Sequence, residues 1–169
     1  FTPDHGIPYP RAKMSLYDAG IETALIMRGP GCFGGARVFK EMISNIDILP
    51  TVLEVLGVGV PDNLQGKSFL PLLQGEGYVP RTEIFAEKTY HCRYDPIRCI
   101  RTNRYKYIRN WKPEDPIEIG CDRLLKVNGK DLQDRYPKTR PAEELYDLRG
   151  DPWEQENLAM KPTYSLINN

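Results

Sequence analysis

The chain has 169 residues, which is long enough for one ordinary hydrophobic core. Its 23 Lys and Arg residues balance 23 Asp and Glu residues, so the net charge gives no basis for bulk attraction to nucleic acid. No apolar run approaches the roughly 20 residues of a membrane-spanning helix.

A strand and two helices are predicted in the first half of the chain. Residues 22–28 form a short apolar run before Gly-Pro-Gly, which is typical of a buried strand. Apolar side chains recur at helical spacing over residues 45–57, where Ser44 or Asn45 can act as N-cap, so we expect a helix there. A second, shorter helix is expected over residues 68–74.

The second half of the chain changes to the pattern of short strands. Residues 83–90 predict one strand, and residues 97–109 predict a strand pair joined by a Thr-Asn-Arg turn. Residues 110–141 carry many Pro, Asp, Gly and Lys residues and predict a long irregular excursion. Residues 144–148 are expected to close the sheet as a further strand.

These elements predict an α/β chain with two unequal parts. Residues 1–80 are expected to be the C-terminal part of a parallel-sheet domain, whose ligand sites lie at the carboxyl ends of its strands. Residues 81–169 are expected to form a small antiparallel-sheet α+β subdomain. The first part lacks sheet partners, so we expect it to be unstable in isolation. Reversible, cooperative unfolding of the 169-residue chain would contradict this expectation.

Asp4 and His5 form a candidate metal site just after the expected end of a strand. A carboxylate and a neutral imidazole can together hold a divalent cation, and Lys13 could bring positive charge to an anion resting on it. Two ligands do not complete a metal shell, so further ligands are expected from elsewhere. The alternative interpretation is a turn in which Asp4 bonds the backbone near Gly6.

Four strings, in the right order, resemble the sulfatase family of the alkaline phosphatase superfamily. The first is Phe-Thr-Pro-Asp-His-Gly with its spaced Lys13 and a following Leu-Tyr-Asp-Ala-Gly. The second is Asn-Ile-Asp-Ile-Leu-Pro-Thr-Val-Leu from residue 45, and the third is Gln-Gly-Lys-Ser-Phe-Leu-Pro-Leu-Leu from residue 65. The last is Glu-Leu-Tyr-Asp-Leu from residue 144 with Asp-Pro-Trp-Glu-Gln-Glu-Asn-Leu behind it. The resemblance implies an alkaline-phosphatase-like parallel sheet domain for residues 1–80.

The resemblance also implies a site that this chain contains only in part. Asp4 and His5 would supply part of a Ca²⁺ shell, and Lys13 would contact the sulfate. Many family members carry Asn at the position of His5, and imidazole is a softer ligand, which leaves the metal open. The N-terminal remainder of the enzyme is the expected partner that brings the nucleophile and the other ligands. A secreted, periplasmic or lysosomal address is implied as well.

None of the four cysteines fits the motif of the family's nucleophile. That nucleophile is a formylglycine, matured from Cys or Ser within Cys-x-(Pro/Ala/Ser)-x-Arg. We therefore expect a C-terminal portion of a longer sulfatase, inactive by itself. The cysteines form no CxxC pair, which argues against zinc, and they leave open two disulfides in any of three pairings or buried thiols.

The string from Thr89 to Arg98 resembles heparan N-sulfatases, which act on N-sulfoglucosamine. The resemblance implies that His91 and Arg98 contact the sugar or its carboxylate neighbours. The alternatives are an ordinary polar residue at a strand end for His91 and an ion pair with a nearby acid for Arg98.

Two other functions stay open at this point. One is a phosphonate or phosphate monoester hydrolase of the same superfamily, because its anion chemistry is similar. The other is a non-catalytic carbohydrate-binding remnant, for which chelator-insensitive binding of heparan fragments by the chain alone would be expected.

Overall fold

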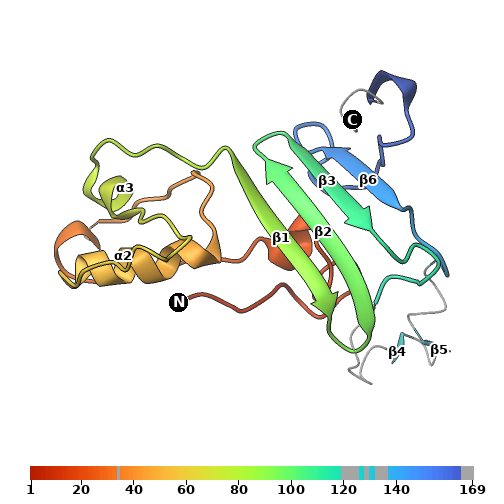
Figure 1. Cartoon of the computed structure of the whole chain (residues 1–169), viewed down its shortest axis with the longest axis horizontal. Helices are drawn as coiled ribbons and strands as arrows, with labels where there is room; N and C mark the ends of the chain where they lie inside the picture. The colour runs from red at the N-terminus through yellow and green to blue at the C-terminus, as the bar shows by residue number, and fades with distance from the viewer. Residues whose placement is uncertain (34, 119–125, 128–129, 132–136, 165–169) are drawn as a thin grey trace. The chain divides into compact units, whose positions relative to one another are not determined.

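The computed structural model describes residues 1–33, 35–118, 126–127, 130–131 and 137–164 (Figure 1). Contacts between Cα atoms divide the chain into two compact units. One comprises Phe1–Leu25 with Phe85–Asn169, and the other comprises Ile26–Ile84. The predicted boundary near residue 80 concerns the domains of a complete enzyme and stays a prediction.

The unit of residues 26–84 is helical. Its elements are η1 (Gly31–Phe33), η2 (Asn45–Asp47), α2 (Ile48–Val55) and α3 (Leu70–Gln74). The two predicted helices are confirmed, since η2 and α2 run together and α3 is followed by Gly75, which has φ of 75°. The core of this unit is built around Phe69, Leu70 and Leu73.

The strand expected at residues 22–28 is wrong for the described residues, which carry no strand there. A strand exists only where a neighbour accepts and donates its backbone hydrogen bonds, and no described segment pairs with this one. An apolar run indicates that a segment is buried, but it does not show that a neighbouring strand is available to pair with it.

Asp47 organises the helical unit from a fully buried position. Its carboxylate accepts hydrogen bonds from the backbone N–H groups of Ser44 (2.9 Å) and Lys67 (2.7 Å) and from the Arg81 guanidinium. Burial alone would raise the pKa of Asp47, but the hydrogen bonds from Arg81 and the backbone outweigh it and lower the pKa. Asp47, the last residue of the Asn-Ile-Asp string, therefore joins three segments of this unit through its hydrogen bonds.

The other unit is built on a four-stranded sheet of order β1-β2-β3-β6 (Figure 1). The strands are β1 (Glu83–Tyr90), β2 (Tyr94–Thr102), β3 (Tyr105–Asn110) and β6 (Glu143–Asp147). β3 pairs antiparallel with both β2 and β6, so the predicted strands and antiparallel sheet are confirmed. The excursion at 110–141 also contains a small ladder of β4 (Lys126–Val127) and β5 (Lys130–Asp131).

Both faces of this sheet carry apolar clusters. One cluster joins Ile97, Cys99 and Ile108 to Leu16 and Tyr17, so the segment around α1 (Asp18–Ile21) packs on the sheet. The other face gathers a set of side chains from β3, β6 and the C-terminal part, namely Leu145, Leu158, Ala159, Tyr105, Tyr107 and Tyr164. Strand alternation sends successive side chains to opposite faces, which produces the two clusters.

A fully buried lysine, Lys106, lies at a core position of β3. Its ammonium is 2.5 Å from Asp18 and 2.9 Å from Glu154, and Arg101 also pairs with Asp18 at 3.1 Å. Burial opposes ionisation of Asp18, but hydrogen bonds from Arg101 and Lys106 lower its pKa overall. Burial raises the pKa of Glu154 even beside Lys106. These ion pairs hold α1 and the segment that contains Glu154 against the sheet.

Candidate functional site

Asp4 and His5 lie together at the start of the sheet unit. The His5 Nε2 atom is 3.4 Å from the Asp4 Oδ2 atom, with 38% of the His5 side chain and 87% of the Asp4 side chain exposed. The other ring nitrogen, Nδ1, lies 2.6 Å from the Gly6 carbonyl oxygen. The recorded polar contact of the Asp4 carboxylate is with His5, not with the backbone near Gly6 as the turn interpretation requires.

Glycine is required after this pair because the chain passes close to α1. A Cβ atom at Gly6 would lie 1.9 Å from the Ala19 carbonyl oxygen, and the Gly6 N–H donates to the Gly20 carbonyl at 3.1 Å. Any larger residue would push the segment away from α1. Gly6 therefore fixes the approach of the Asp-His pair.

Lys13 lies in a loop with an unusual backbone. Arg11 and Met14 on either side have φ of 63° and 71°, values that L-residues other than glycine rarely adopt. The Lys13 N–H donates to the Ile7 carbonyl at 3.0 Å, which places this loop against the residues that follow His5. The Arg11 guanidinium stacks over the Tyr17 ring at 3.8 Å and so holds the strained loop on the sheet unit.

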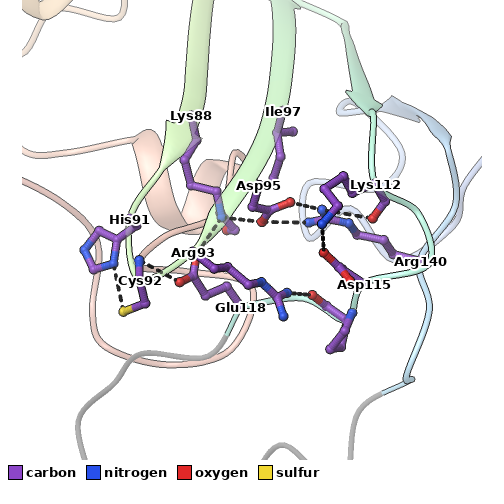
Figure 2. Close-up of polar contacts among 12 residues, drawn as sticks. Lys88, His91, Cys92, Arg93, Asp95, Ile97, Lys112, Asp115, Glu118 and Arg140 are labelled. Carbon is purple, nitrogen blue, oxygen red and sulfur yellow. Dashed lines mark hydrogen bonds and ion pairs between the residues drawn. The ribbon is translucent and has the colours of Figure 1, made fainter.

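His91 is exposed in the short turn between β1 and β2 (Figure 2). Its Nδ1 atom lies 3.3 Å from the Cys92 sulfur, and ligand atoms of His91, Cys92 and Glu118 all lie within 4.8 Å of one another. Cys92 is disulfide-bonded, so its sulfur is not a thiolate. We therefore do not assign a metal to these three residues.

The cysteines divide into bonded and free groups. Cys99 is a free, buried thiol, whose pKa burial raises to about 11. Two disulfides would use all four cysteines, so the free thiol of Cys99 rules out each of the three predicted pairings.

Arg98 is engaged along β1 on several sides. Its Nε atom is 2.9 Å from Glu87, and its terminal nitrogens donate to the Lys88 carbonyl and the Thr89 hydroxyl, both at 3.0 Å. The ion pair with a nearby acid, which was the alternative interpretation of Arg98, is therefore present. Its side chain is 41% exposed, so one face remains open to solvent.

Three buried charged side chains and one lysine with a side chain that is 10% exposed gather at the hairpin end, and they were not predicted. Lys88, Asp95, Glu118 and Arg140 form this group, which we call the Asp95 cluster (Figure 2). Lys88 lies 2.6 Å from Asp95 and 3.0 Å from Glu118, and Arg140 donates to both oxygens of Asp95. Two positive and two negative charges compensate one another, which makes their burial tolerable.

One signal in the sequence pointed to this cluster. Lys88 follows Ile84 and Ala86 on the inward-facing positions of β1, and a lysine there needs a buried partner. The partners Glu118 and Arg140 lie in the irregular excursion, where no periodic pattern indicates which side chains face inward.

The Asp95 cluster predicts a pH-dependent stability. Burial raises the pKa of Asp95, but hydrogen bonds from Arg140 and Lys88 outweigh this and lower it below its usual value. A lowered folded pKa contributes stability above the unfolded pKa of about 3.9, and this is lost as the pH falls through the folded pKa. We expect Asp95→Asn to lower Tm at pH 6, and the difference from wild type to shrink as the pH falls from 5 towards 2. A difference in Tm that stays constant over this range would contradict the prediction.

Comparisons with known proteins agree on one family. The family model described as "N-sulphoglucosamine sulphohydrolase, C-terminal" matches residues 11–140. An ulvan-active sulfatase of Formosa agariphila is 34% identical over 99% of this chain and 34% of its own length. Human N-sulphoglucosamine sulphohydrolase is 26% identical over 99% of this chain and 38% of its own length. The chain thus spans about a third of the length of these curated relatives.

Solved structures give the same fold. A protein of Bacteroides thetaiotaomicron assigned as a sulfatase superposes with a TM-score of 0.65 at 28% identity, over 92% of this chain and 29% of the other. A phosphonate monoester hydrolase of Silicibacter pomeroyi has a TM-score of 0.62 at 24% identity, over 92% of this chain and 28% of the other, which shows a shared fold alone. Among the described residues, no helix has the length and apolar character needed to cross a bilayer.

Proposed function

Since the chain belongs to the family of N-sulphoglucosamine sulphohydrolase C-terminal domains, we propose that it is the C-terminal part of a sulfatase acting on sulfated glycans. The substrate class we propose is the N-sulfate or sulfate ester of heparan-type sugars. Support comes from relatives named as N-sulphoglucosamine sulphohydrolase and delta 4,5-hexuronate-2-O-sulfatase. We place the boundary between its catalytic-domain part and its C-terminal subdomain at residues 80 and 81.

The contact between Asp4 and His5 carries this proposal. The Gly6 carbonyl can only accept a hydrogen bond, so the contact at 2.6 Å places a proton on His5 Nδ1 and leaves Nε2 as the ring nitrogen that could bind a metal. Nε2 lies 3.4 Å from a carboxylate oxygen of Asp4, so one cation could contact both atoms. Two ligands bound side by side to one ion at about 2.4 Å are separated by roughly this distance.

The proposed metal is Ca²⁺, which a carboxylate suits better than an imidazole does. When bound, it would neutralise charge on the sulfonyl oxygens and make sulfur easier to attack. Asp4 and His5 would hold it, with the remaining ligands and the formylglycine nucleophile supplied outside this chain. His5 would be oriented by the Gly6 carbonyl, as metal-binding histidines commonly are by a second hydrogen bond.

Lys13 is proposed to contact the sulfate, and His91 and Arg98 the sugar. The strained backbone around Lys13 supports its role, because such conformations cluster at functional sites. Lys13 would add positive charge where negative charge accumulates in the transition state. The exposed ring of His91 and the open face of Arg98 can reach a ligand in solvent. A secreted, periplasmic or lysosomal location suits such a substrate and is part of the proposal.

The test is to produce the complete protein encoded in frame with this chain. We expect the upstream DNA to encode the Cys/Ser-x-(Pro/Ala/Ser)-x-Arg motif. The purified protein should release sulfate from N-sulfoglucosamine or from a 2-O-sulfated hexuronate disaccharide. EDTA should abolish turnover, and Ca²⁺ should restore it. The 169-residue chain alone should be inactive.

Two outcomes would replace the proposal. Preferential hydrolysis of a phosphonate monoester would favour the superfamily's other chemistry. Binding of heparan fragments unaffected by EDTA, without sulfate release by the complete protein, would favour a carbohydrate-binding role.

A further inference from the structure

The turn that carries His91 is hydrogen-bonded to a buried carboxylate, that of Glu118. Residues 91–93 connect β1 to β2, and His91 and Cys92 are exposed while Glu118 is only 7% exposed. The Cys92 N–H donates to the Glu118 Oε1 atom at 2.9 Å (Figure 2). The Arg93 guanidinium donates to the Pro116 carbonyl, so a second contact joins the turn to the same segment.

The Cys92 N–H belongs to the peptide group that links His91 to Cys92. Its hydrogen bond to Glu118 therefore fixes the rotation of that peptide plane, and with it the direction in which the His91 side chain leaves the backbone. A hydrogen bond from a backbone N–H to a carboxylate is stronger than one between neutral groups. The disulfide at Cys92 restrains the position of this residue's side chain, but the peptide plane is held by Glu118.

Glu118 is itself held by the Asp95 cluster. Its other oxygen, Oε2, is 3.0 Å from Lys88 Nζ, which also pairs with Asp95 at 2.6 Å. Lys88 has 10% and Asp95 0% of its side chain exposed, so this support is rigid and screened from water. A ligand-contacting side chain must be held to within about 0.5 Å to bind well, and an exposed turn by itself does not meet that requirement.

We infer that Glu118 is a positioning residue, which orients His91 towards the sulfated sugar by fixing the turn at residues 91–93. This inference rests on the proposed function, in which His91 contacts the substrate. Glu118 itself touches no substrate. Its effect should appear in substrate binding rather than in the chemical step.

The kinetic test uses the complete enzyme with N-sulfoglucosamine. Glu118→Ala should raise KM about 10-fold with kcat nearly unchanged, as expected for the loss of one hydrogen bond that supports binding. Glu118→Gln keeps an oxygen acceptor for the Cys92 N–H and should change KM less than about 3-fold. Asp115→Ala removes a carboxylate from the same segment, where Asp115 pairs with Lys112 at 2.9 Å, and should leave KM unchanged.

A double-mutant cycle separates positioning from general stability. If Glu118 acts through His91, then Glu118→Ala should have no further effect on KM in a His91→Ala enzyme. Additive effects, or a His91→Ala enzyme with unchanged kinetics, would overturn the inference while leaving the sulfatase assignment intact.

A second measurement is independent of turnover. Amide hydrogen exchange of Cys92 in the complete protein should become faster in Glu118→Ala and remain slow in Glu118→Gln and Asp115→Ala. Unchanged exchange in Glu118→Ala would overturn the inference whether or not a substrate is found. Absence of all sulfate release would instead count against the proposed function.

Discussion

Replacing Lys106 with alanine is expected to destabilise the sheet unit by about 3–5 kcal/mol, because it removes the cation from a buried charge network. The Lys106 side chain is 0% exposed and is the partner of both Asp18 and Glu154. Asp18 keeps Arg101, but Glu154 is left in a buried position where its pKa is already raised by burial. The measurement is the midpoint of thermal unfolding of the complete protein by calorimetry.

Two further variants make this prediction specific. Arg104→Ala removes a neighbouring but partly exposed ion pair with Asp147, and it should lower the midpoint of unfolding far less than Lys106→Ala does. Lys106→Met combined with Glu154→Gln removes the charges of both partners. Neither is then left buried without its counter-charge, so this variant should recover most of the lost stability. If Lys106→Ala lowered the stability no more than Arg104→Ala, the buried ion pairs of Lys106 would not stabilise the sheet unit as we describe.

Replacing Asp4 with alanine is expected to reduce kcat/KM of the complete enzyme by about 10³-fold or more, since a bound cation stabilises transition-state charge by several kcal/mol. Its carboxylate is 87% exposed and makes no backbone contact near Gly6, so its removal should barely change folding. The measurement is sulfate release from N-sulfoglucosamine together with bound Ca²⁺ determined by elemental analysis.

The matched control is Asp62→Ala, which removes another exposed aspartate remote in sequence from the candidate site. It should leave both activity and metal content unchanged. An Asp4→Ala enzyme with full metal content and full activity would remove Asp4 from the metal shell. Loss of activity with unchanged metal content would assign it a different role.

Local sequence patterns predicted most of the sheet and the helices. Strand alternation identified β1, β2, β3 and β6, and helical spacing with an N-cap identified η2 and α2. These elements are encoded by neighbouring residues, so a short window is enough to recognise them. The strand predicted at residues 22–28 is not present among the described residues, because a strand needs a neighbouring strand to pair with, and the run's own residues do not show whether one is available.

The candidate site was predicted in part. Asp4 and His5 are adjacent in the chain, so their proximity follows from sequence, and the resemblance to sulfatases pointed to Lys13, His91 and Arg98. The sequence did not reveal that Glu118 holds the turn that carries His91, because these two residues are joined only through the folded excursion.

The family and the order of the strands along the chain could be predicted from local patterns and recognisable strings, and the same strings indicated the candidate site residues. Which charges are buried together follows only from the folded arrangement of the chain. Lys106 meets Asp18 across 88 residues of sequence, and Asp95 meets Arg140 across 45. Such pairs form because a charge enters a low-dielectric interior only when an opposite charge is already placed there, and that placement is a property of the whole fold.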